Sequence, residues 1–263
     1  MKQAITQYLM VIMLVVGAYL LGVYKTKTEY LEKGMANTVA QVGQQPEAQP
    51  TPKPIDPAKI EELFADNSNM VFGDRNSKLK FVEFSDTSCP FCHVAGGHNP
   101  SLSVQMNPRF ATEKEGGSYV PPVLEIKKLV DQGKAAFMWL YTPGHGNGEL
   151  GTLALYCANE QGKFWEAHDL LMNNDGYTLV NDKVKNDRAK VGEVASFLKG
   201  VLDQNKLTNC ITSKKYEARV TGDPQIASSF GYGATPTFFI NEKVVEGAAS
   251  WTDSFQGIVE PLL

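Results

Sequence analysis

Two cysteines separated by two residues constrain this 263-residue chain more than any other feature. They occur in the segment Cys89-Pro-Phe-Cys92, which follows a strand-like run at residues 80–84. Because Pro90 is well tolerated only in the first turn of a helix, the pair is predicted to open a helix. Free N–H groups and the macrodipole stabilise a thiolate at such a helix start. We therefore expect Cys89 to be an acidic, exposed thiol and Cys92, one turn further on, to be more buried.

A Cys-x-x-Cys pair is compatible with a redox disulfide, a metal site or a covalently attached haem. His93 completes the literal haem-attachment pattern, but so short a pattern has low specificity. A zinc site would need two more ligands, and the four histidines supply no second close pair along the sequence. We expect a charge on His93 to modulate the nearby thiolate. The other histidines are expected to be surface or capping residues, namely His98, His145 and His168.

Charge and cysteine content exclude some classes of protein. The formal net charge of −4 argues against a nucleic-acid partner, which would need a basic face. A hydrophobic content of 43% is ordinary for a soluble core. Besides the close pair there are only two lone cysteines, Cys157 and Cys210, in a chain far too long for a disulfide-stapled miniprotein.

The N-terminal part of the chain is predicted to be a membrane anchor and a tether. Residues 3–24 carry no charge and approach the roughly 20 apolar residues that span a bilayer. We favour an uncleaved helix over a cleaved signal peptide because no convincing small-x-small site follows the apolar run. Residues 35–56 are rich in Pro and Gln, which predicts an extended linker. The predicted parts are thus an anchor with its flank at 1–34, this linker, and a folded domain at 57–263.

The folded part has the pattern of an α/β domain. A strand, a helix and a strand come first, a block with helical spacing and few strand signals follows, and a hairpin and a helix close the chain. This order predicts a mixed sheet interrupted by a helical insertion. The predicted strands cover residues 80–84, 135–141, 237–240 and 243–245, the insertion covers about 149–230, and helices start at Asp56-Pro57, cover 125–130 and start near Thr252.

Four segments carry a resemblance to a known family. They are Phe84-Ser-Asp-Thr-Ser-Cys89-Pro-Phe-Cys92, Glu83 just before it, Cys157-Ala-Asn-Glu-Gln-Gly-Lys-Phe-Trp-Glu-Ala-His168, and Gly231-Tyr-Gly-Ala-Thr235-Pro236-Thr-Phe-Phe-Ile-Asn241. Together they resemble the thioredoxin-like thiol:disulfide oxidoreductases, most closely the membrane-anchored bacterial members of the DsbA-type branch. The resemblance spans about residues 70–263. It implies a thioredoxin-like fold with a helical domain inserted between its βαβ and ββα halves, after one transmembrane helix.

The resemblance also implies roles for single residues. Cys89 and Cys92 would be the redox-active pair, and Glu83 a buried acid beneath it. Glu83 shares a strand face with Phe81, and if that face is inward, burial raises the pKa of the carboxyl and suits it to relay a proton to or from Cys92. Composition alone predicts a trans Thr235-Pro236 bond, whereas the resemblance implies a cis bond facing the dithiol. The residues expected to contact substrate are Pro90, Phe91, Thr235 and Pro236, with backbone pairing to an extended segment before Pro236.

For the lone cysteines the resemblance implies a structural Cys157–Cys210 disulfide inside the helical insertion. Two buried free thiols are the alternative. Closing a loop of that length would stabilise the fold by up to roughly 4 kcal/mol on the chain-entropy model.

The function implied is an exported, membrane-tethered thiol:disulfide oxidoreductase that forms disulfides in cysteine-containing, unfolded or extended proteins. It would need no cofactor or metal beyond its cysteine pair, and would act as a monomer on the extracytoplasmic side of the cell membrane, with a redox partner in that membrane. A reductase or an isomerase would use the same atoms. The alternatives from other classes are a redox-inactive chaperone or binding module and, least favoured, a c-type haem protein.

The chain departs from the family pattern after the dithiol. Residues 95–122 are rich in Gly, Asn and Pro, whereas the family continues a long helix from its active site. We therefore predict a short or broken active-site helix.

Overall fold

The computed structural model of this protein describes residues 55–263. The predicted membrane helix, its flank and nearly all of the predicted linker lie outside the described residues. None of the helices within residues 55–263 combines the length and the apolar character needed to cross a bilayer.

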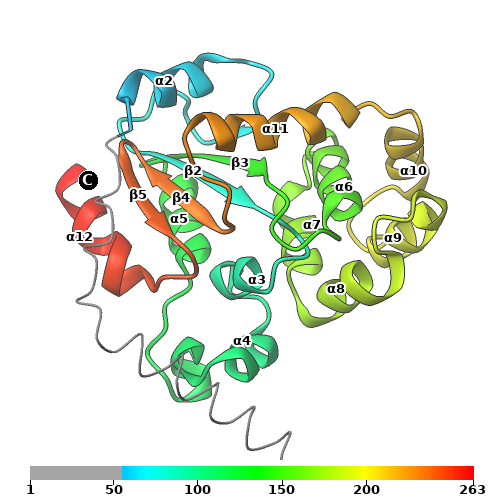
Figure 1. The fold of residues 1–263 in the computed structure, drawn as a ribbon, viewed down its shortest axis with the longest axis horizontal. Coiled ribbons are helices and arrows are strands. Elements are labelled where there is room, and N and C mark those ends of the chain that lie inside the picture. Colours follow the sequence, from blue (N-terminus) through cyan, green and yellow to red (C-terminus); the bar gives the residue numbers. More distant parts are fainter. Residues whose placement is uncertain (1–54) are drawn as a thin grey trace, which may run out of the picture. The chain divides into compact units, whose positions relative to one another are not determined.

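A five-stranded mixed sheet forms the centre of the domain (Figure 1). Its strands lie in the order β1-β3-β2-β4-β5, and only the β2–β3 pair is parallel. The two-residue edge strand β1 was not predicted, because two residues are too few to show a periodic pattern. The strands are β1 (Val71–Phe72), β2 (Lys80–Ser85), β3 (Ala136–Tyr141), β4 (Thr237–Ile240) and β5 (Lys243–Glu246).

Helices cover both faces of the sheet (Figure 1). On one face α2 and α11 pack over Val82 and Phe84, and on the other α5 and the C-terminal helices pack over Phe81 and its neighbours. All six residues of β2 are buried, so the side chains of this strand contact two separate cores. The helices before the long helical block are α2 (Pro57–Ala65), α3 (Pro90–Gly96), α4 (Pro100–Met106) and α5 (Pro122–Asp131), and α12 (Gln256–Val259) lies near the C-terminus.

The predicted helix starts follow from local capping. The Asp56 carboxylate accepts a 3.0 Å hydrogen bond from the Ala58 N–H, and Pro57 occupies the first helical position of α2. Helix α3, which carries Cys92, has only seven residues, as the short-helix prediction requires. It ends at Gly97, whose φ of 77° is left-handed, and a Cβ there would lie 2.7 Å from Pro121 Cβ.

The chain between β3 and β4 is helical from Glu149 to Ser229. The predicted disulfide is confirmed: Cys157 in α6 is bonded to Cys210 in α10, with Cα atoms 6.0 Å apart. The helices of this block are α6 (Glu149–Glu160), α7 (Phe164–Leu171), α8 (Asn174–Thr178), α9 (Val191–Phe197), α10 (Gln204–Thr212) and α11 (Glu217–Ser229).

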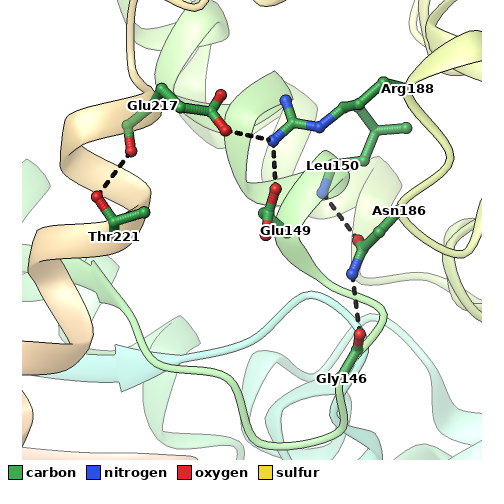
Figure 2. A network of polar contacts seen from close by, with 7 residues as sticks. All are labelled: Gly146, Glu149, Leu150, Asn186, Arg188, Glu217 and Thr221. Atoms are coloured by element: carbon green, nitrogen blue, oxygen red, sulfur yellow. Dashed lines mark hydrogen bonds and ion pairs between the residues drawn. The ribbon is translucent and has the colours of Figure 1, made fainter.

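A polar network ties the start of α6 to the rest of the helical block (Figure 2). The Arg188 guanidinium forms ion pairs with Glu149 at the start of α6 and with Glu217 at the start of α11. The Asn186 side chain accepts a hydrogen bond from the Leu150 N–H and donates a 2.8 Å hydrogen bond to the Gly146 carbonyl. These contacts fix the loop between β3 and α6, which is hydrogen-bonded to the segment just before Cys89.

Replacing both Cys157 and Cys210 by Ala is expected to lower the free energy of unfolding by about 4 kcal/mol, because the bridge closes a long loop in the unfolded chain. The measurement is denaturant unfolding of the wild type and the double variant, both with Cys89 and Cys92 oxidised. Equal unfolding midpoints and slopes would contradict the prediction.

Candidate functional site

The dithiol lies where β2 passes into α3. Cys89 is the N-cap of α3, Pro90 is its first residue, and the Cys92 N–H bonds to the Cys89 carbonyl at 3.0 Å. Cys92 is more buried than Cys89, as predicted. The prediction that Cys89 is exposed was wrong, because only 4% of its surface is accessible. The Thr235 carbonyl and Met172 cover it, since the Cys89 Sγ–H donates to that carbonyl at 3.4 Å and Met172 packs on both cysteines.

The two thiols have opposite acidities. A hydrogen bond from the Cys92 side chain, with others from the Thr235 hydroxyl and the N–H groups of Cys92 and Phe91, lowers the pKa of Cys89 to about 6 against the opposing effect of burial. Burial, first, and the neighbouring Cys89 and Glu83 charges raise the pKa of Cys92 well above its usual value. At neutral pH the reduced site therefore holds one thiolate, at Cys89, and one thiol.

Glu83 lies inside the protein on the β2 face that also carries Phe81, as predicted. Burial raises the pKa of its carboxyl to about 7, and the nearby Cys89 charge adds to this effect. Neither Glu83 Oε2 nor the Ser85 hydroxyl has a hydrogen-bond partner among the described residues. A charge on Glu83 also raises the pKa of Cys92, so the ionisation of the carboxyl and that of the thiol oppose each other.

The peptide bond between Thr235 and Pro236 is cis, as the resemblance implied and composition alone did not. Pro236 is buried, Thr235 is half-buried, and β4 begins at the next residue. The Thr235 hydroxyl has no partner when Cys89 is a thiol, so it is free to donate to the thiolate.

His93 does not have the expected role. It is completely buried, and burial lowers the pKa of its imidazole to about 4, so the ring is uncharged at neutral pH. Its Nδ1 lies 2.8 Å from the Met172 carbonyl and its Nε2 lies 3.0 Å from the Thr87 carbonyl. One N–H is available to a neutral ring, so one of these contacts is a hydrogen bond. His93 thus holds α3 against the segments that carry Thr87 and Met172.

Sequence reasoning missed Asp86, which organises the loop before Cys89. One carboxylate oxygen accepts hydrogen bonds from the N–H and the hydroxyl of Ser88, both at 2.7 Å. The other accepts from the N–H groups of Gly144 and His145, at 2.8 and 2.9 Å. An aspartate that accepts from the backbone two residues on is a common turn signal and could have been recognised. The contacts to residues 144–145 could not, because they join segments far apart in the sequence.

A pocket of about 410 Å³ lies beside the dithiol. Phe91, of which 42% is accessible, forms part of its wall, and so does Thr235, whose carbonyl contacts Cys89. The Tyr119 hydroxyl, also in the lining, has no hydrogen-bond partner among the described residues. The remaining lining comes mainly from residues 109–119 and 246–254.

The other histidines are only partly where they were expected. His145 is exposed, but His168 is buried against the rings of Phe164 and Trp165. His98 and His168 also form a close group with Asp169, which the linear sequence did not reveal because His98 and α7 are far apart along the chain. This group is separate from the cysteines.

The family model described as Thioredoxin matches residues 122–260, slightly more than half of the chain and entirely beyond the dithiol. A structure of alpha-DsbA1 from Wolbachia pipientis superposes with a TM-score of 0.55 at 17% identity, covering 78% of this chain and 95% of that one. It establishes the fold. Disulfide bond formation protein D of Bacillus subtilis is 23% identical over 200 residues, which are 73% of this chain and 76% of that protein.

A protein named Na⁺/H⁺ antiporter NhaA 3, from Salinispora tropica, is 25% identical over 175 residues. The match takes in 65% of this chain but only 21% of that protein. The chain thus spans about a fifth of the length of this curated relative.

The reduced protein is expected to show thiolate absorbance near 240 nm that titrates with a midpoint near pH 6 and is lost in Cys89→Ser. Thr235→Val removes a hydroxyl donor with little change of shape, so the midpoint should rise by about one unit, the equivalent of one hydrogen bond to a charged group. A wild-type midpoint near the ordinary thiol value of about 8.5 would contradict this account of the site.

Glu83→Gln is expected to change how stability depends on pH. The folded-state pKa of Glu83 lies above that of the unfolded chain, so the wild type loses stability as pH rises toward 7, and the variant does not. Between about pH 4.5 and pH 8 the variant should gain about 3 kcal/mol relative to the wild type in denaturant unfolding. Glu62→Gln, at an exposed position of α2, is the control, and parallel curves for wild type and Glu83→Gln would contradict the prediction.

Proposed function

Because the chain belongs to the thioredoxin family, we propose that it is a thiol:disulfide oxidoreductase whose redox centre is Cys89 and Cys92. The observation that carries the proposal is the opposite shift of the two thiol pKa values, lowered at Cys89 and raised at Cys92. A disulfide-exchange centre needs one thiol that reacts as a thiolate and one that stays protonated until it is needed. No further cofactor is required for this chemistry.

In the oxidising direction the site starts as a Cys89–Cys92 disulfide. A substrate thiolate attacks Cys89 Sγ, the Cys89–Cys92 bond breaks, and Cys92 leaves as a thiolate that takes up a proton, which Glu83 can supply. A second substrate thiolate then attacks the substrate sulfur of the mixed disulfide, and Cys89 leaves as a thiolate. Two electrons have passed from the substrate to the cysteine pair, and a separate electron acceptor must remove them before the next cycle.

We favour the oxidase direction because Cys89 is a good leaving group. A thiolate with a pKa near 6 is stable at neutral pH, which stabilises the reduced site and makes its disulfide more oxidising. This stabilisation is complete above the unfolded-state pKa of about 8.5 and is lost as pH falls through 6. A reductase or an isomerase would use the same two sulfurs and would differ in redox potential.

The substrates proposed are cysteine-containing proteins in unfolded or extended form. Cys89 is two residues from the exposed Phe91 and contacts Thr235, and both of these residues line the pocket of about 410 Å³. Pro90 and Phe91 on one side, and Thr235 and Pro236 on the other, would flank a segment carrying the reacting cysteine. The backbone of Thr235, which is half-buried beside Cys89, would pair with an extended chain.

We further propose that the domain acts outside the cytoplasm, tethered to the cell membrane as a monomer. The uncharged run at residues 3–24 and the Pro-rich residues 35–56 support an anchor and a tether. The Cys157–Cys210 disulfide supports an oxidising compartment. In that setting the acceptor that re-oxidises Cys89 and Cys92 would be a membrane protein.

Cys92→Ser is expected to accumulate protein adducts joined through Cys89, since the thiol that would release them is missing. Non-reducing electrophoresis and mass spectrometry of cells expressing the full chain would detect these adducts. Cys89→Ser/Cys92→Ser is the matched control and should carry none. Absence of adducts in Cys92→Ser would favour the redox-inactive chaperone or binding module.

A redox titration of the Cys89–Cys92 pair in the wild-type protein then distinguishes an oxidase from a reductase. A potential near the ~−120 mV of DsbA supports the oxidase proposed here, and one near the ~−270 mV of thioredoxin supports a reductase.

A further inference from the structure

Three side chains with metal-binding atoms meet behind the active-site helix. His98 lies in the turn after α3, while His168 and Asp169 are neighbours on α7. Asp169 Oδ1 is 3.0 Å from His98 Nε2 and 3.1 Å from His168 Nδ1. The three atoms all lie within 4.8 Å of one another. From this convergence we propose that His98, His168 and Asp169 form a binding site for one divalent transition-metal ion of the zinc class.

The donor set selects the kind of ion. Two imidazole nitrogens and one carboxylate oxygen suit Zn²⁺, whereas Ca²⁺ and Mg²⁺ prefer sites made of oxygen atoms. Three protein ligands leave one of four positions for water or another small ligand. The cysteines contribute nothing, because they lie at the opposite end of α3.

The spacing needs only small adjustments. With metal–ligand distances of about 2.0–2.1 Å, two ligands of a tetrahedral ion lie about 3.3 Å apart, close to the two distances observed. His168 is fixed, since only 1% of its side chain is accessible and its Cε1 would lie 3.8 Å from a Cβ added at Gly96. His98 follows the left-handed Gly97 and has 26% of its side chain accessible, so it can make the adjustment.

The site is also accessible to an ion. About 40% of the Asp169 side chain faces solvent, which gives an ion a route to the two imidazoles. Without an ion, the same carboxylate oxygen lies within hydrogen-bonding distance of both rings. With an ion bound at His98 Nε2 and His168 Nδ1, each neutral ring would carry its single proton on its other nitrogen.

An ion in this position would join the end of α3 to α7. Met172 lies one turn beyond His168, packs on both cysteines and offers its carbonyl to His93. The proposed site therefore braces the same helix that carries the dithiol, without touching the sulfurs.

The test is calorimetric titration of Zn²⁺ into the full chain, purified in mild detergent without a histidine tag. Cys89 and Cys92 are kept oxidised so that they cannot coordinate the ion. The wild type is expected to bind one Zn²⁺ per chain. His98→Gln and Asp169→Asn should each bind Zn²⁺ at least about 100-fold more weakly than the wild type. A loss of this size exceeds the one expected if the residue only supported a metal ligand without contacting the ion. His145→Gln, which removes an exposed histidine elsewhere, should bind like the wild type.

A second measurement separates loss of binding from loss of folding. Zn²⁺ should raise the thermal unfolding midpoint of the wild type and of His145→Gln but not that of Asp169→Asn. The proposal is overturned if the wild type binds no Zn²⁺, if it prefers Ca²⁺ or Mg²⁺, or if His98→Gln and Asp169→Asn bind as tightly as the wild type.

Discussion

Strand β2 is buried on both faces, and this burial sets the chemistry at its carboxyl end. A charge on Glu83 is costly there, so its carboxyl keeps a proton to about pH 7. Cys92, one helical turn inside α3, is held protonated by the same exclusion of water. Cys89 is almost as buried, but donors surround it and stabilise its thiolate. The two thiols therefore differ in pKa because hydrogen-bond donors stabilise the Cys89 thiolate, although both thiols are buried.

Most donors around Cys89 belong to Phe91 and Cys92 in α3, and only the Thr235 hydroxyl comes from a segment distant in the sequence. Contacts between distant segments hold α3 and the loop before it in place. Asp86 joins the loop before Cys89 to the β3–α6 loop. Arg188 and Asn186 in turn fasten the start of α6 to the helical block (Figure 2). His93 and Met172 connect that block to α3. The helical block is therefore a support for the active-site helix as well as an additional layer on the sheet.

The sequence predicted those parts of the site that depend on local chemistry. The Pro after Cys89 indicated a helix start, the alternation around Glu83 indicated a shared face with Phe81, and the Gly- and Pro-rich residues after Cys92 indicated a short helix. The cis bond before Pro236 and the Cys157–Cys210 bridge came from the family resemblance.

What the sequence could not predict depends on contacts between distant segments. The burial of Cys89 requires Met172 and the Thr235 loop, and the neutral state of His93 requires its complete enclosure. The same holds for the proximity of His98 to α7. The residues that make these contacts show no periodicity or spacing in the sequence that would predict them.

Helix α3 is short, and this limits how much of the surface around Cys89 it forms. The influence of a helix start on a thiolate is confined to the first turn, so the seven residues of α3 already supply it in full. Beyond Gly97 the chain turns away, and residues 109–119 wall the pocket beside Phe91 without lengthening that helix. Residues 109–119 shape this part of the surface without donating a hydrogen bond to Cys89, so they can change in evolution while the acidity of Cys89 is kept, whereas Phe91 and Thr235 contribute to both properties.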